Sequence, residues 1–356
     1  MGRVVIVTGV AGDLGRRFAR RLAEHADVDR VIGVDVTPPR ADIGSMQFVR
    51  ADIRNPIIAK VIAREQVDTV VHMSVASVAP NGSGSSSVKE LNVIGTMQLL
   101  AACQQAQSLR HLIVKSSSSV YGASSRDPAM FTEQMTAKRL PTSGYPKDVF
   151  EVESYVRGFA RRRPDVRVTT LRMANILGPM IHSPLTAYFR LPVIPTVLGF
   201  DPRMQFLHEH DAHVSLEHAV LNEVPGTFNV VGDGTMMLSQ IIRRLGRPSL
   251  PLPPFGVASF GTTLKQARLV DFSREQVAFL TYGRGLDGTR MRTELGFHPV
   301  HTTEEAFDDF VASVNPGLLR PQRVIAAERV LHDALTRSSS KTTGATNRSE
   351  IEETAR

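Results

Sequence analysis

The chain is poor in cysteine, and Cys103 is the single one among its 356 residues. One cysteine excludes a framework of internal disulfides and is typical of the reducing cytosol, so we expect a cytoplasmic protein. Long hydrophobic runs are also absent. The longest apolar stretch, residues 191–200, is interrupted by two prolines, whereas a membrane helix needs roughly 18 apolar residues. An apolar strand pattern begins at residue 3, so we expect no signal peptide and no membrane partner.

Charge of one sign is not concentrated in any patch. The formal net charge is +7, but arginines are spread along the whole chain. The densest cluster, residues 161–163, lies at the end of an expected helix, where cations suit the helix dipole. A diffusely basic surface attracts anionic cofactors and substrates, so we predict no nucleic-acid partner.

What the chain does contain is a glycine-rich turn at its start. Thr8-Gly9-Val10-Ala11-Gly12-Asp13-Leu14-Gly15 follows the apolar run 4–7 directly. In such a turn one glycine permits the bend, one admits a pyrophosphate to the backbone, and one packs helix on strand. The next expected strand ends in Asp35, where a carboxylate accepts hydrogen bonds from an adenosine ribose and repels the extra phosphate of NADP. The pattern predicts NAD as the cofactor.

Strand and helix patterns alternate through the first half of the chain. This alternation predicts an α/β fold, a doubly wound parallel (Rossmann) sheet with a smaller C-terminal substrate lobe over its C-terminal edge. The expected strands are 3–8, 30–35, 47–49, 68–73, 110–116 and 166–173, and the expected helices are 13–25, 56–65, 88–107 and 145–162.

The expected domains follow from where this rhythm breaks. Residues 1–175 form the NAD-binding domain, and 206–235 return to it as a helix over 211–220 and a strand over 227–231. The substrate lobe then takes 176–205 and 236–315, within which 251–285 is expected to be loop-rich. A C-terminal helix is expected over 316–337. Residues 338–356 carry almost nothing to bury, which predicts a disordered tail.

Beyond these patterns, the chain resembles the extended short-chain dehydrogenase/reductase superfamily, and within it the NAD-dependent epimerase/dehydratase family typified by UDP-glucose 4-epimerase. The resemblance covers roughly residues 1–310. Besides the glycine turn and Asp35, it rests on Asp52-Ile53, Asn92-Val93-x-Gly95-Thr96, Ser116-Ser117-x-x-Val120-Tyr121-Gly122, Tyr145, Leu171-Arg172-x-x-Asn175-x-x-Gly178-Pro179, Gly226-Thr227-Phe228-Asn229-Val230 and Glu294-Leu295-Gly296-Phe297-x-Pro299.

The resemblance implies a role for each matching residue. Ser117 would hydrogen-bond the reacting hydroxyl, and Tyr145 would be the general base during hydride transfer. Asn175 would face the phosphate side of a nucleotide-sugar substrate, and the family is typically a homodimer through helices 88–107 and 145–162. The implied cofactor contacts are Gly9, Gly12, Asp13, Leu14, Gly15, Asp35, Asp52, Ile53, Met73, Ser74, Val75, Asn92 and Tyr145.

The chain departs from the family at one catalytic position. In the family a lysine follows the tyrosine by four residues, but here that place is Val149, and no tyrosine of this chain has lysine at that spacing. Lys147 lies two positions after Tyr145 and should point away, about 200° round the helix. An unassisted tyrosine has a pKa near 10, so losing the lysine is expected to slow the reaction strongly.

Lys115 is a candidate replacement, because it lies two residues before Ser117 and alternate residues of a strand share a face. If the strand persists to Ser117, the Lys115 ammonium should point towards the same edge. The alternative is a surface contact of Lys115 elsewhere.

A second departure lies at residues 204–211. The arginine with which the family grips a nucleotide-sugar phosphate aligns with Met204, and the adjacent Arg203 is the candidate substitute. His208 and His210 alternate on a possible strand, but no third ligand is evident, so we predict a surface histidine pair and no metal site.

Three functions remain open from the sequence. The first is an NAD-dependent epimerase, dehydratase or reductase on a nucleotide sugar with an atypical active site. The second is a dehydrogenase or reductase on an apolar ketone or alcohol, with residues 191–200 and the phenylalanines 255, 260 and 272 lining its pocket. The third is a non-catalytic NAD-binding protein. We favour the first.

Overall fold

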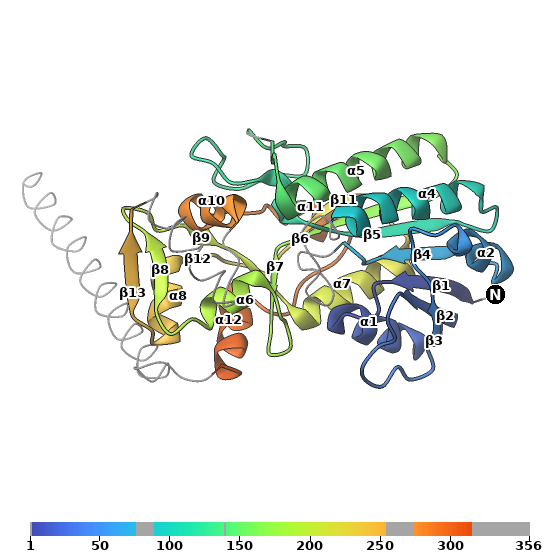
Figure 1. The fold of residues 1–356 in the computed structure, drawn as a ribbon, viewed down its shortest axis with the longest axis horizontal. Coiled ribbons are helices and arrows are strands. Elements are labelled where there is room, and N and C mark those ends of the chain that lie inside the picture. The colour runs from blue at the N-terminus through green and yellow to red at the C-terminus, as the bar shows by residue number, and fades with distance from the viewer. Residues whose placement is uncertain (1, 76–88, 139, 254–272, 315–356) are drawn as a thin grey trace, which may run out of the picture.

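The computed structural model describes residues 2–75, 89–138, 140–253 and 273–314 (Figure 1). Its centre is a seven-stranded sheet in the order β11-β6-β5-β4-β1-β2-β3, in which all neighbouring strands are parallel. The strands are β1 (Arg3–Thr8), β2 (Val28–Asp35), β3 (Gln47–Arg50), β4 (Thr69–His72), β5 (His111–Ser117), β6 (Arg167–Met173) and β11 (Gly226–Val230). The predicted doubly wound α/β fold is confirmed.

Helices cover both faces of this sheet (Figure 1). One face carries α2 (Ile57–Arg64), α4 (Gly95–Gln105) and α5 (Gly144–Arg162), with a π-helical turn, η2 (Glu90–Ile94), leading into α4. The other carries α1 (Asp13–Ala23) and α7 (Glu209–Asn222). Because both faces are covered, Val5, Ile6 and Val7 are all fully buried, as a parallel strand requires.

Further elements lie towards the left of Figure 1, beyond the carboxyl ends of the strands, and form the smaller lobe. Its core is a second hydrophobic cluster that includes Phe189, Phe206, Phe307 and Phe310. The elements are β7 (Asn175–Leu177), α6 (Pro184–Phe189), β8 (Ile194–Val197), β9 (Arg203–Met204), β10 (Phe206–His208), β12 (Met236–Met237), α8 (Leu238–Leu245), β13 (Ser249–Leu252), α10 (Arg274–Tyr282) and α12 (Thr303–Ala312).

Two details differ from the sequence expectations for this half. The range 251–285 is not simply loop-rich, because Ser273 caps a regular helix, α10, with its side chain on the Gln276 N–H. After it, α11 (Thr289–Thr293) packs on β11, and Met291 and Phe297 belong to the core of the large domain although they lie within 236–315.

The expected helix over 316–337, the tail 338–356 and the phenylalanines 255, 260 and 272 lie outside the described residues. Within the described residues, no helix combines the length and the hydropathy that crossing a membrane demands.

Candidate active site

The glycine turn between β1 and α1 is shaped by close backbone contacts. Gly9 has a φ of +82°, and a Cβ there would lie 3.0 Å from the Ser74 nitrogen at the end of β4. A Cβ on Gly15 would lie 2.3 Å from the Gly9 carbonyl oxygen, so helix and strand could not approach as they do. At Gly12 a Cβ would meet only the Gly9 oxygen, at 3.7 Å. Gly9 and Gly15 permit the close backbone contacts of the turn. Gly12 leaves space beside the first turn of α1, which contains Asp13 and Leu14.

Asp35 closes this loop from the end of β2. Its carboxylate accepts hydrogen bonds from the Ala11 N–H (2.9 Å) and the Val36 N–H (2.7 Å). Burial raises the pKa of Asp35, and the nearby charge of Asp52 adds to the rise. Asp52 itself is held by Arg54 at 2.7 Å, which lowers its pKa, and Ile53 beside it is buried. The two acids therefore share one end of the site.

A neutral histidine anchors the end of β4. His72 Nδ1 lies 2.9 Å from Thr8 Oγ1, and its Nε2 lies 2.8 Å from Thr96 Oγ1. Burial lowers the pKa of His72 to about 4, and the positive charge of Lys115 contributes. Beyond it Met73 and Val75 are buried and Ser74 is partly buried, at the carboxyl edge where we expected cofactor contacts.

Ser117 and Tyr145 come together at the same edge. Ser117 ends β5 in an extended conformation, and Tyr145 lies in the first turn of α5. Burial raises the pKa of Tyr145 to about 12, a hydrogen bond from Ser117 lowers it, and the charge of Asp148 raises it. With its pKa raised, the Tyr145 phenol stays protonated at neutral pH and cannot accept a proton without further help.

The position of the missing lysine is part of the core. Val149 is fully buried among the hydrophobic residues of the large domain. Lys147 points outward and pairs with Glu151 at 3.7 Å, so it does not replace the lysine. Asn92 is buried on η2 and donates to Asp148 (3.1 Å), which ties this turn to the start of α5.

Lys115 lies on β5, two residues before Ser117. The pairing of β5 with β6 runs without interruption through Lys115 and Ser117, so the strand geometry persists to its last residue. Lys115 is partly buried, and burial lowers its pKa to about 8.

Several family landmarks serve the scaffold instead. Ser116 donates to Glu153 (2.6 Å), which also forms a buried ion pair with Arg172 (2.6 Å). Arg172 in turn donates to the Tyr121 hydroxyl (2.8 Å), which bonds Asn229 on β11. This network joins α5, β5, β6 and β11 beneath the site.

Two arginines of the second half of the chain, Arg203 and Arg284, are candidate cations for the site. Arg203 is exposed on β9, where its side chain contacts the Ala129 carbonyl oxygen at 3.5 Å, whereas Met204 is fully buried. Arg284, which the sequence did not single out, donates to the Gly122 carbonyl (2.8 Å) and to Ser118 (3.3 Å). Burial lowers the pKa of Arg284 to about 10. Asn175 lies on β7, paired with Phe206.

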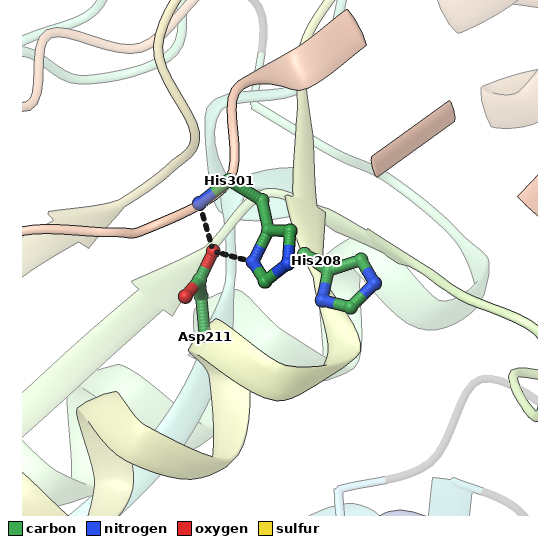
Figure 2. A group of neighbouring side chains, drawn as sticks. All are labelled: His208, Asp211 and His301. Carbon is green, nitrogen blue, oxygen red and sulfur yellow. Dashed lines mark hydrogen bonds and ion pairs between the residues drawn. The ribbon is translucent and has the colours of Figure 1, made fainter. Parts of the chain in front are cut away.

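The expected surface histidine pair is wrong. His208 is buried and stacks on His301 with ring centroids 3.9 Å apart, whereas His210 is exposed (Figure 2). Asp211 lies beside them and accepts from the backbone and side chain of His301 (2.9 and 3.1 Å) and from the Val300 N–H (3.1 Å). Sequence alone missed His301 because it lies 90 positions beyond Asp211.

These three residues are near enough to one another to suggest a metal site. The Asp211 carboxylate is nevertheless already bonded by the Val300 and His301 N–H groups. His208 Nε2 is also bonded to Asp309 (3.0 Å), and its Nδ1 accepts from the His210 N–H. The cluster is a clamp that joins α7 to the segment before α12.

Comparison with known proteins places this architecture. Residues 5–198 match the NAD dependent epimerase/dehydratase family. An uncharacterised protein of Mycobacterium tuberculosis is 50% identical over 312 residues, which cover 86% of this chain and 83% of that protein. A trifunctional UDP-glucose 4,6-dehydratase of Arabidopsis thaliana is 26% identical over 186 residues, 49% of this chain and 28% of its own.

Solved structures agree on the fold. The UDP-glucuronic acid 4-epimerase of Bacillus cereus, in complex with UDP-glucuronic acid and NAD, has a TM-score of 0.66 at 19% identity and covers 87% of this chain and 98% of its own. The UDP-glucose 4-epimerase of Thermotoga maritima, with UDP-glucose, has a TM-score of 0.65 at 18% identity and covers 87% and 98%. The chain belongs to the NAD-dependent epimerase/dehydratase family.

Proposed function

We propose that the protein is an NAD-dependent oxidoreductase of the epimerase/dehydratase type that acts on a nucleotide sugar by hydride transfer. The observation that carries the proposal is that Ser117, the last residue of β5, and Tyr145, in the first turn of α5, lie at the carboxyl edge of the sheet, where the Ser117 side chain favours the ionised phenol. The glycine turn and Asp35 line the same edge, which is where ligands of doubly wound sheets bind.

The residues of this edge fit NAD. The open space at Gly12 admits a pyrophosphate to the first turn of α1, whose N–H groups attract phosphate. In this proposal Asp35 binds the adenosine ribose, and Asp52 and Ile53 contact the adenine. Bound NAD supplies the hydride acceptor. An acid in Asp35's place disfavours the additional phosphate of NADP.

In this proposal Tyr145 takes the proton of a sugar hydroxyl while the carbon that bears it loses hydride. Ser117 orients that hydroxyl and the phenol through its own hydrogen bond. A tyrosine with a pKa of about 12 is almost wholly protonated at neutral pH, so a positive charge must favour the phenolate when substrate is present.

The substrate's diphosphate requires cations from the lobe. Arg284 supports this, because its guanidinium bonds Ser118, the residue next to Ser117. Arg203, which is exposed on β9, is the second candidate, and in this proposal Asn175 faces the phosphate side of the substrate. The relatives whose names and structures include UDP-sugars favour this substrate class.

A reductase on an apolar ketone is the second candidate, favoured by the exposed Leu198 and Phe200 of the stretch 191–200. A non-catalytic NAD-binding protein is the third, favoured by the buried Val149.

We also propose a cytoplasmic homodimer through α4 and α5, with light scattering as the test of the dimer.

Product analysis separates these functions. The protein with NAD would be incubated with UDP-glucose, UDP-glucuronic acid and dTDP-glucose, and the nucleotide sugars separated by chromatography. We expect an epimerised or dehydrated product from one of them, and none in a Tyr145→Phe control. If the sugars do not react and show no binding in calorimetry, while an apolar ketone is reduced with NADH, the second candidate replaces the first.

A further inference from the structure

The start of α5 lacks a positive charge where hydride transfer needs one. Val149 is fully buried, and Lys147 is engaged by Glu151 on the outer surface. Tyr145 is partly buried, and the nearby Asp148 opposes the ionisation of its phenol. A cation that favours the phenolate has to come from an element other than α5.

Strand β5 offers one. Lys115 and Ser117 are alternate residues of a strand whose pairing with β6 is regular, as Lys115 lies opposite Leu171 and Ser117 opposite Met173. Ser116 between them points the other way, to Glu153. Lys115 and Ser117 therefore share a face, and their Cα atoms are roughly 6.6 Å apart at the usual rise of a strand. The four-carbon lysine stem spans such a distance.

The charge of Lys115 has no counterpart in the described part of the chain. No carboxylate or carbonyl group of the described residues bonds its ammonium group, although the side chain is partly buried. Its field reaches His72 on β4, which it helps to keep neutral. A partly buried ammonium group beside a ligand edge is a candidate for stabilising a charge that develops there.

We propose that Lys115 is a positioning residue that takes over from the missing lysine and favours the phenolate of Tyr145 from the Ser117 side of β5. The proposal rests on the function proposed above. It assigns to a strand the charge that the family pattern places on a helix, and it explains how Val149 can be tolerated.

The other charged groups around this point do not fill that role. His72 on β4 is neutral, because burial and Lys115 lower its pKa to about 4. On α5 and β6, Glu153 and Arg172 neutralise each other. His213 on α7 bonds the Leu14 carbonyl, and burial lowers its pKa to about 4. Arg284 bonds Ser118 and Gly122, and the function proposed above assigns its charge to the substrate's diphosphate.

The first test follows the ionisation of Tyr145 without any substrate. The chain has no tryptophan and five tyrosines, so the near-ultraviolet band of tyrosinate is readable, and subtraction of Tyr145→Phe isolates one phenol. With NAD bound, Lys115→Met should raise the pKa of Tyr145 by about one unit or more, a tenfold or larger shift in ionisation. The matched control Lys147→Met should leave it unchanged.

The second test is rescue. Lys115→Met combined with Val149→Lys should bring the pKa of Tyr145 back towards that of the unaltered protein, because the charge returns from the helix side. The rate of NAD reduction by a nucleotide-sugar substrate should fall on the order of a hundredfold in Lys115→Met and recover in the double variant. The limb of the pH profile on which the rate rises with pH should move with the titration, because Tyr145 acts in its deprotonated form.

An unchanged titration in Lys115→Met overturns the proposal even if the protein turns over a nucleotide sugar. A shifted titration in a protein that processes no sugar supports the Lys115–Tyr145 coupling and instead contradicts the proposed substrate class. Equal NAD affinity and equal melting temperature of Lys115→Met and the unaltered protein exclude a merely structural effect.

Discussion

Two regions at one edge of the sheet differ in how closely they follow the family. The glycine turn with Asp35 keeps the family's residues, and its backbone distances exclude a side chain at Gly9 and Gly15. The first turn of α5 keeps Tyr145 but buries Val149 where the family has its lysine. Binding of the cofactor and activation of the base are thus separable here, since different elements provide them.

This difference shows that the glycines of a cofactor site can be predicted from their spacing in the sequence. A catalytic charge is instead defined by its position in the folded structure. The glycines act through their own backbone, so their spacing in sequence fixes their role. A cation acts through its field, and an ammonium on β5 can serve the same phenol as one on α5.

The sharpest way to test the catalytic side is to remove the base. Tyr145→Phe should lower the rate of NAD reduction by a nucleotide sugar on the order of 10³-fold, because proton transfer is lost. Its affinity for NAD should change little. Tyr155→Phe on the outer part of α5 is the control, and stopped-flow absorbance of the reduced nicotinamide is the measurement. Equal rates in both variants would remove Tyr145 from the mechanism.

The cofactor side is tested by two glycines with opposite expectations. Gly15→Ala should lower the free energy of unfolding by about 2–3 kcal/mol, because its Cβ would meet the Gly9 oxygen at 2.3 Å. Gly12→Ala should cost less than about 1 kcal/mol, since Gly12 caps α1 with a φ of −77°. It should nevertheless weaken NAD binding about tenfold or more by filling the pyrophosphate space.

Urea unfolding and calorimetry with NAD measure the two effects. If Gly12→Ala binds NAD like the unaltered protein, the pyrophosphate does not lie at this turn and the cofactor half of the comparison fails.

Buried histidines beneath both regions make the fold sensitive to acid. His72 and His111 have pKa values lowered to about 4 by burial, below the unfolded value of 6.5. The unfolded state therefore binds more protons, and stability present above pH 6.5 is lost as the pH falls towards 4. Each should contribute about 2 kcal/mol of this loss between pH 7 and 5. Urea unfolding at both values should show a smaller loss in His111→Gln, and an equal loss would contradict the assignment.

The smallest effect concerns the choice of cofactor. Asp35→Asn should lower the preference for NAD over NADP by about tenfold, near 1.4 kcal/mol, because the repulsion of the ribose phosphate is removed. Calorimetry with both nucleotides measures the ratio, and Asp42→Asn, an exposed acid beyond β2, is the control. An unaltered ratio would place the adenosine ribose away from Asp35.

Local signals made the first half of the chain predictable. Strand, glycine turn and helix are neighbours in sequence, and the pairing of β5 through Ser117 confirmed the geometry that the Lys115 hypothesis required. Contacts between distant segments could not be predicted. Arg284 donates a hydrogen bond to Ser118, which lies 166 positions earlier, and no sequence pattern in either segment predicts this contact. The His208–His301 stack was missed for the same reason.

The central claim is that the protein is a working enzyme although Val149 replaces a lysine. The most direct measurement is the near-ultraviolet absorbance of reduced nicotinamide in NAD-loaded protein mixed with a panel of UDP- and dTDP-sugars, with Val149→Lys in parallel. The account predicts that the unaltered protein forms the reduced band with at least one sugar. If the unaltered protein forms no band of reduced nicotinamide and only Val149→Lys forms one, the claim is contradicted. That result would favour a protein that binds NAD without catalysis.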